Sequence, residues 1–357
     1  MAEGRPRIEW MDLVKGTTVI VIVLSHAIDL MEPIAGGHPI QHAWSLLETI
    51  LEPMRMCLFF MVSGMLATAA VTKPWNKVRR RTWGMAYLYV LWSAIFFAVV
   101  YIYAPLPIID ELRMFARNLA VAGNGYWYLY ALIVYFVLAR LTRRWPIWIL
   151  LGVAVVLNLM KYPLISFYRE HLAFDTGSMI VKVLINLVFF LIGLHFKEIL
   201  ARITQYATWP RIAALIATVI VIGVWRFNTP WSWEESFLPA SLLYMVLAIM
   251  LASKLIAYQG PRRFGTVIGT QTLPIFVVQF PFLLALSQVF KNDDLGFYQN
   301  PIFLLLFPIA FTAFNAVFAL WLHRITLNGV GKYLFEVPEW IAHEGKKDEA
   351  RANPQAA

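Results

Sequence analysis

The stretch that decides the fold reads Trp10-Met-Asp-Leu-Val-Lys15-Gly-Thr-Thr-Val-Ile-Val-Ile-Val-Leu-Ser-His26-Ala-Ile-Asp29. A run of about 20 mostly apolar residues is long enough to cross a bilayer as a helix. Lys15 and His26 are eleven residues apart, so both lie on one helix face, about 16 Å apart along the axis. Asp12 lies one turn before Lys15, and Asp29 lies one turn after His26. Ionisable side chains are costly inside a bilayer, so this stripe is the first candidate functional site.

The composition indicates a polytopic membrane protein. Of 357 residues, 60% are hydrophobic and only 14% are charged, whereas soluble domains are nearer a quarter charged. The net charge of +9 comes from basic residues spread over alternate loops, and this pattern argues against binding of nucleic acid. The single cysteine, Cys57, excludes an intrachain disulfide and a cysteine-based zinc site. We expect neither a metal nor a permanently bound cofactor.

The hydrophobic pattern predicts an all-α bundle of about ten transmembrane helices. A separate short surface helix is expected at 41–53. The predicted spans are 13–31, 55–72, 83–104, 127–141, 146–160, 179–196, 212–226, 237–256, 266–290 and 301–323.

The distribution of basic residues predicts that both termini are cytoplasmic. With the N-terminus inside, the inner segments hold 22 Lys and Arg residues and the outer loops hold 6, as the positive-inside rule requires. We expect a multi-pass protein in the cytoplasmic membrane of a bacterium. Residues 1–326 would form the membrane domain, and 327–357 a polar, disordered cytoplasmic tail with a surface segment around 333–340.

His26 is the leading catalytic candidate. A lone histidine in a helix is usually a core residue bonded to a neighbouring helix. Here it shares a stripe with Lys15 and Asp29, which favours a functional role. A neutral imidazole can take a proton from a hydroxyl group and return it to a leaving group.

A run of three arginines, Arg79, Arg80 and Arg81, precedes the third span. The positive-inside rule alone accounts for basic residues at this place. The alternative is a cytoplasmic phosphate site, because arginine pairs with phosphate through two parallel hydrogen bonds. Composition does not decide between the two.

Four further residues are candidates for substrate contact. For each of them a purely structural role is the alternative interpretation. Arg55 lines an outward cavity or lies at the interface with its charge in the headgroup region. Ser63, before a glycine, contacts substrate or lets two helices approach closely. Trp127 stacks on a sugar or acyl group, or belongs to the aromatic belt. Gln279 lies in a span with two prolines, which predicts a broken helix lining protein or water.

Several segments taken together resemble the acyltransferase-3 family of integral membrane acyltransferases, and the match runs from about Arg7 to His323. A basic residue and a histidine with ten residues between them, Lys15 and His26, are similar to that family's first motif. Two positions differ from the family pattern: Lys15 stands where arginine is common, and Gln279 where a histidine often ends the late motif. The other similar segments are Leu58–Leu66, Lys73–Trp92, Trp127–Tyr130, Asn186–Gly193 and Gly269–Phe276.

The resemblance implies transfer of an acyl group, often acetyl from acetyl-CoA, to a hydroxyl of a carbohydrate or glycolipid. The donor would enter from the cytoplasm, with its phosphates bound by Lys15 and by Arg79, Arg80 and Arg81. His26 would act as general base, oriented by Asp29, while Asp12 would complete the catalytic group by holding Lys15.

The alternative function is a proton-coupled transporter or flippase for a small molecule or a lipid-linked sugar. The same stripe of ionisable residues suits proton coupling. The sequence shows no inverted repeat and no pair of broken helices in matching halves, which argues against this class.

Overall fold

The computed structural model describes residues 8–35, 37–172, 177–229, 238–292 and 295–342. Within these ranges the regular structure is helical and includes no strand, which confirms the all-α prediction. The α-helices are α1 (Glu9–Ala35), α2 (Pro39–Val71), α3 (Arg79–Tyr103), α4 (Ile108–Ala120), α5 (Trp127–Leu141), α6 (Ile147–Leu159), α7 (Lys161–Leu172), α8 (Gly177–His195), α9 (Lys197–Ile203), α10 (Trp209–Asn228), α11 (Leu238–Leu255), α12 (Gln259–Val267), α13 (Thr272–Asn292), α14 (Leu295–Tyr298), α15 (Pro301–Ile325) and α16 (Glu339–Ala342). Short 3-10 helices are η1 (Trp75–Val78), η2 (Thr204–Tyr206) and η3 (Val330–Leu334).

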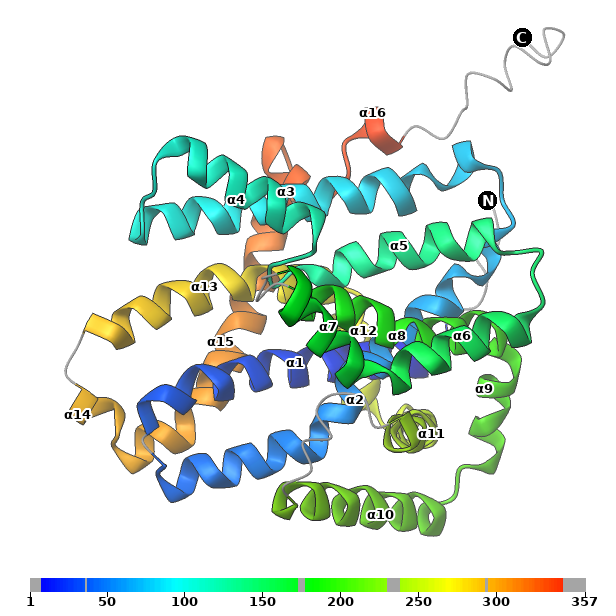
Figure 1. Cartoon of the computed structure of the whole chain (residues 1–357). Helices are drawn as coiled ribbons and strands as arrows, with labels where there is room; N and C mark the ends of the chain where they lie inside the picture. The colour runs from blue at the N-terminus through cyan, green and yellow to red at the C-terminus, as the bar shows by residue number, and fades with distance from the viewer. Residues whose placement is uncertain (1–7, 36, 173–176, 230–237, 293–294, 343–357) are drawn as a thin grey trace, which may run out of the picture.

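Seven of the described helices are long and apolar enough to cross a membrane. The pairs α6–α7 and α8–α9 bend by 64° and 81°, and counting each as one span raises the number to nine. The fourth predicted span is α5, whose 15 residues are shorter than a typical span. The chain is therefore a multi-pass membrane protein. Figure 1 shows α10 along the lower edge of the bundle and α3 with α4 along the upper edge.

The predicted surface helix at 41–53 is wrong, because these residues belong to one continuous helix with the second span. Helix α2 has 33 residues and contains Pro53 without a break. At 1.5 Å per residue it is about 50 Å long, against a hydrocarbon core of about 30 Å. Glu48 and Glu52 therefore lie in the first half of the same continuous helix whose second half spans the membrane.

Helices α2 and α8 form the most extensive helix pair in the bundle. Two glycines at their crossing replace side chains with backbone contact. A Cβ atom on Gly193 would overlap the Met61 carbonyl oxygen, and one on Gly64 would overlap the Phe190 carbonyl oxygen. Such close approach is how small residues allow membrane helices to pack.

The helix break predicted around the late prolines lies earlier than expected. The chain leaves helical geometry between α12 and α13, at residues 268–271, whereas Pro281 lies inside α13 without ending it. A proline in a membrane helix is tolerated where neighbours satisfy the freed backbone groups.

The segment after α15 packs against α3. The Tyr87 hydroxyl donates to the Tyr333 carbonyl at 3.0 Å, and the Trp92 indole N–H donates to the Leu334 carbonyl at 2.8 Å. Phe335 is buried, and its ring packs on Trp92 with centroids 5.6 Å apart. The surface segment expected around 333–340 thus contacts α3, while 343–357 lie outside the described residues.

We predict that Gly193→Ala destabilises the α2–α8 pair. The added methyl group would have to displace the Met61 carbonyl, and overpacking of this kind costs about 1–3 kcal/mol. Thermal unfolding of the purified protein in detergent measures the effect as a lower midpoint. Gly152→Ala in α6 is the matched control, because its Cβ meets no atom within 4 Å. Equal midpoints for the two variants would contradict the packing.

Candidate functional site

Two cavities lie on either side of the middle of the bundle. The first, the basic cavity, has a volume of about 420 Å³ and is lined by Lys15, Arg80 and Arg81 together with apolar side chains. The second, the histidine cavity, has about 410 Å³ and is lined by His26, Asp29 and residues of α2, α5, α8 and α13. Lys15 and His26, at the two ends of the ionisable stripe on α1, thus each line a cavity.

The basic cavity is a concentration of positive charge. Lys15 pairs with Asp12 at 2.8 Å, and the Arg81 guanidinium donates to the Leu66 carbonyl at 2.8 Å. No carboxylate lines this cavity among the described residues. Arg79 was predicted to join this group, but it lines a separate surface pocket with Trp75 and Trp83. One residue of the arginine run therefore points away, because successive helical residues differ by about 100° in direction.

The start of α1 is held by the break between α12 and α13. A Cβ atom on Gly269 would overlap the Asp12 carbonyl oxygen, so only glycine allows this approach. Asp12 itself is buried and lies about 21 Å from His26 along the helix axis. It is therefore too far away to contact the imidazole, and its carboxylate pairs with Lys15 instead.

His26 is open to its cavity and oriented by two neighbours. Its side chain is 34% exposed, and Nδ1 lies 3.6 Å from the nearer carboxylate oxygen of Asp29. This distance is longer than a hydrogen bond, so the carboxylate acts on the ring through charge. The Phe280 ring packs against the imidazole with centroids 5.4 Å apart. With Nδ1 toward Asp29, Nε2 is the nitrogen available for proton transfer.

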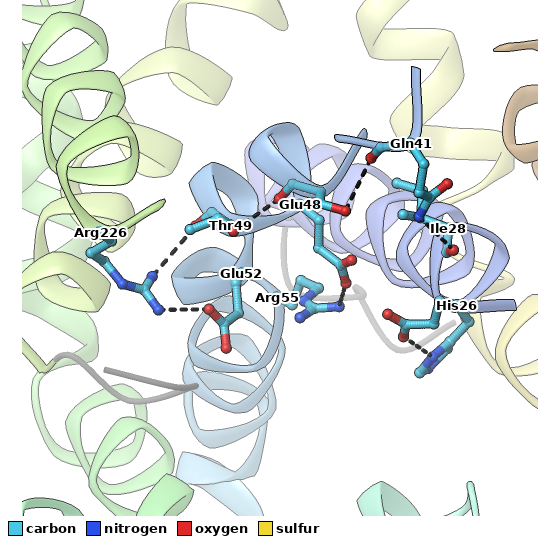
Figure 2. A network of polar contacts seen from close by, with 10 residues as sticks. His26, Ile28, Gln41, Glu48, Thr49, Glu52, Arg55 and Arg226 are labelled. Carbon is cyan, nitrogen blue, oxygen red and sulfur yellow. Dashed lines mark hydrogen bonds and ion pairs between the residues drawn. The ribbon is translucent and has the colours of Figure 1, made fainter. Parts of the chain in front are cut away.

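A charged network on α2 extends from the histidine cavity toward α10 (Figure 2). Arg55 donates to Glu48 at 3.0 Å. Arg226 on α10 donates to Glu52 at 2.7 Å and to the Thr49 carbonyl at 3.4 Å. Buried charges need partners of this kind. Arg55 therefore lines the cavity, as one of its two interpretations proposed, with its guanidinium held by Glu48.

Tyr128 and Phe276 line both cavities and so form the partition between them. Their ring centroids are 5.5 Å apart. The Tyr128 hydroxyl lies 2.8 Å from Ser63 Oγ, on the side of the basic cavity. Phe276 packs on Phe280 at 5.5 Å, so a line of aromatic rings joins Ser63 to His26.

The remaining predicted contacts divide between the cavities and the core. Trp127 lines the histidine cavity and packs on Phe60 with centroids 5.9 Å apart. Gln279 is fully buried outside both cavities, and its amide donates to the Phe276 carbonyl at 3.0 Å. The structure therefore does not place Gln279 at a substrate site.

The sequence analysis missed the partition between the two cavities. Phe276 and Phe280 are four residues apart, the spacing of neighbours on one helix face. Glu48 and Arg55, seven apart, also share a face, because α2 is continuous through both residues. Lys182 and Asn186 on α8 complete the cavity wall. The described residues include no group of three His, Cys, Asp or Glu side chains arranged for a metal.

Comparison with known proteins decides the family. The model of a family described as an acyltransferase domain, acyltransferase-3, matches residues 8–323. The chain belongs to the acyltransferase-3 family. This membership supports acyl transfer as the general activity and confirms the resemblance seen in the motifs.

A relative of the family points to the same location. The inner membrane protein YcfT of Escherichia coli K12 is 25% identical over 302 residues, which cover 75% of this chain and 77% of that protein. Together with the apolar helices, this match places the acyltransferase-3 chain in the cell membrane as a multi-pass protein. No solved structure matches it.

We predict that the two cavities select thiol reagents of opposite charge. In a Cys57→Ser background, Ser63→Cys tests the basic cavity and Met56→Cys tests the histidine cavity. An anionic methanethiosulfonate should react about tenfold faster than a cationic one at Ser63→Cys, because charged clefts focus opposite ions. The order should reverse at Met56→Cys. Rates normalised to free cysteine measure the preference, and the same order at both sites would contradict it.

Proposed function

We propose that this protein is a membrane O-acyltransferase that moves an acyl group, acetyl in the simplest case, from acyl-CoA to a hydroxyl of a cell-envelope carbohydrate or glycolipid. The observation that carries the proposal is the pair of cavities separated by Tyr128 and Phe276. One cavity offers cations without carboxylates, and the other offers an imidazole. A reaction between a polyanionic donor and a hydroxyl acceptor needs both.

The basic cavity is the proposed donor site. The phosphates of acetyl-CoA would meet Lys15, Arg80 and Arg81, since guanidinium groups bind phosphate through paired hydrogen bonds. The long pantetheine arm suits the separation of about 16 Å between Lys15 and His26. It would run along the apolar wall toward the partition, where Ser63 and Tyr128 provide hydroxyl groups.

The chemical step is assigned to His26. Nε2 would take the proton of the acceptor hydroxyl while the hydroxyl oxygen attacks the thioester carbonyl. The carbon–sulfur bond then breaks, and the imidazolium returns the proton to the leaving thiolate. Asp29, 3.6 Å from Nδ1, would stabilise the imidazolium that forms between these two transfers.

This step requires the donor's acyl carbon and the acceptor hydroxyl to meet near the partition. Tyr128 and Phe276 are the side chains that separate the cavities, so we propose that the thioester passes between their rings. The apolar surroundings would keep water away from the thioester and limit its hydrolysis.

We predict that His26→Ala lowers the rate of acyl transfer by about 100- to 10,000-fold, the usual contribution of a general base. Acetyl-CoA binding should persist, because the cations lie in the other cavity. Release of free CoA by purified protein measures turnover, and calorimetry measures donor binding. A folded variant with near-normal turnover would remove His26 from the mechanism. Phe280→Leu, which keeps an apolar neighbour of the imidazole, is a control for packing.

We predict that Arg80→Gln weakens acetyl-CoA binding by about tenfold or more, whereas Arg79→Gln leaves it nearly unchanged. A hydrogen bond to a charged group contributes about 1.5–3 kcal/mol, and 1.4 kcal/mol is tenfold in affinity. Only Arg80 of this pair lines the basic cavity. Both variants remove one charge from adjacent exposed positions, so any effect on membrane topology is matched. Equal losses in calorimetric affinity would contradict the donor site.

A further inference from the structure

We propose that a groove between α3 and α5 binds an anionic phospholipid, with the lipid phosphate at Arg79 and an acyl chain along the two helices. This tryptophan groove has a volume of about 500 Å³ and is lined by Trp75, Arg79 and Trp83 on one side and by Ile133 and Val137 on the other. It shares no lining residue with the basic cavity or the histidine cavity. The lipid site is therefore separate from the site of acyl transfer.

The groove opens toward the bilayer. The side chain of Trp83 is 65% exposed and that of Trp75 is 49% exposed. Both belong to the membrane-spanning stretch Trp75–Tyr103, so in a multi-pass membrane protein their exposed surface contacts lipid. Tryptophan is enriched where a span meets the headgroup region, because its ring is apolar and its N–H is polar. A phospholipid is therefore the molecule that borders this groove.

One wall of the groove is a single helix face that changes from polar to apolar. Trp75, Arg79, Trp83 and Ala86 follow one another at intervals of three or four residues along η1 and α3, so they lie in one stripe. The polar lining residues, Asn76 and Arg79, come at the start of this stripe, and Ala86 lies further along it. This order suits a lipid, whose headgroup lies at the start of the span and whose chain runs inward.

The other wall, on α5, changes in the same direction. The Arg140 guanidinium lies 4.1 Å from the centre of the Trp75 ring, so the end of α5 meets the start of η1. Val137 and Ile133 come about one and two turns before Arg140 and line the groove beside α3, with which α5 packs (Figure 1). The groove thus becomes apolar in the direction in which an acyl chain would extend.

Arg140 holds the Trp75 ring in place before any ligand binds. It is buried, and its guanidinium donates to the Ala70 and Val71 carbonyls at 2.9 and 3.2 Å. A cation over an aromatic face is attracted to it, so the indole is fixed by a side chain that is itself fixed. A preformed wall lowers the conformational entropy that binding would cost.

The segments that form the groove contain no acidic residue. None occurs between Glu52 and Asp110 or between Glu111 and Glu170. The positive-inside rule explains why basic residues gather at this end of the bundle, but not why Arg79 lines a groove with apolar walls. Guanidinium groups bind phosphate through paired hydrogen bonds, and basic pockets between membrane helices bind anionic headgroups. Arg79, which lies outside the basic cavity, is thus the phosphate ligand of the lipid.

The test is a lipid titration of the full chain in detergent, followed by native mass spectrometry. Phosphatidylglycerol and phosphatidylcholine with identical acyl chains differ in headgroup charge alone at the phosphate end. Phosphatidylglycerol should bind at least fivefold more tightly, because the choline cation would lie near Arg79 and Arg140. Glycerol 3-phosphate, which carries the phosphate without chains, should not displace the lipid at the same concentration.

Two pairs of variants locate the lipid in the groove. Arg79→Gln should weaken binding of phosphatidylglycerol about tenfold, as loss of a charged hydrogen bond predicts, and Arg263→Gln, which removes the same charge from an exposed position on α12, should not. Val137→Phe fills the apolar part of the groove and should weaken binding of both lipids several-fold. Val153→Phe makes the same change at an exposed position on α6 and should have no effect.

Equal binding of the two lipids by the unmodified protein would overturn the proposal. Equal losses in Arg79→Gln and Arg263→Gln would also overturn it, since the attraction would then come from the general charge of the surface. Displacement of phosphatidylglycerol by glycerol 3-phosphate, or full binding by Val137→Phe, would show that no acyl chain occupies the groove.

Discussion

The cost of placing ionisable groups inside a membrane helix governs this structure. Helix α1 carries Lys15 and His26 where most membrane helices carry apolar residues, and each must have a partner. Asp12 and Asp29 supply these partners from the same helix. The surroundings of Lys15 and His26 are not filled with apolar side chains, because such packing would exclude the water that still solvates these two groups. The two cavities are the consequence.

The other helices surround the two cavities and still pack as one bundle. Glycines on α2 and α8 bring backbones into contact, which leaves the neighbouring side chains free to line a cavity. Paired charges such as Arg226 with Glu52 connect α10 to α2. Tyr128 and Phe276 close the path in the middle. A closed middle fits an acyltransferase better than a transporter, since only the acyl group, and not a whole solute, must pass.

The sequence predicted most of the helices and the shared helix face of Lys15 and His26. Each feature that it did not predict has a specific physical reason. Hydrophobic runs reveal spans, and the spacing of Lys15 and His26 revealed their shared face, because both are local properties of one helix. The direction of Arg79, the burial of Gln279 and the length of α2 depend on neighbouring helices. The aromatic partition joins α5 to α13, over a hundred residues apart, and no local pattern indicates such a contact. A surface segment was expected around 333–340, but its packing on α3 depends on contacts more than 200 residues apart, which polar composition does not reveal.

The most direct test of the account is a structure of the protein bound to a non-hydrolysable analogue of acetyl-CoA. The account predicts the phosphates beside Lys15 and Arg80, and the acyl end between Tyr128 and Phe276, pointing toward His26. An analogue bound elsewhere, or one whose acyl end lies away from the partition, would contradict it.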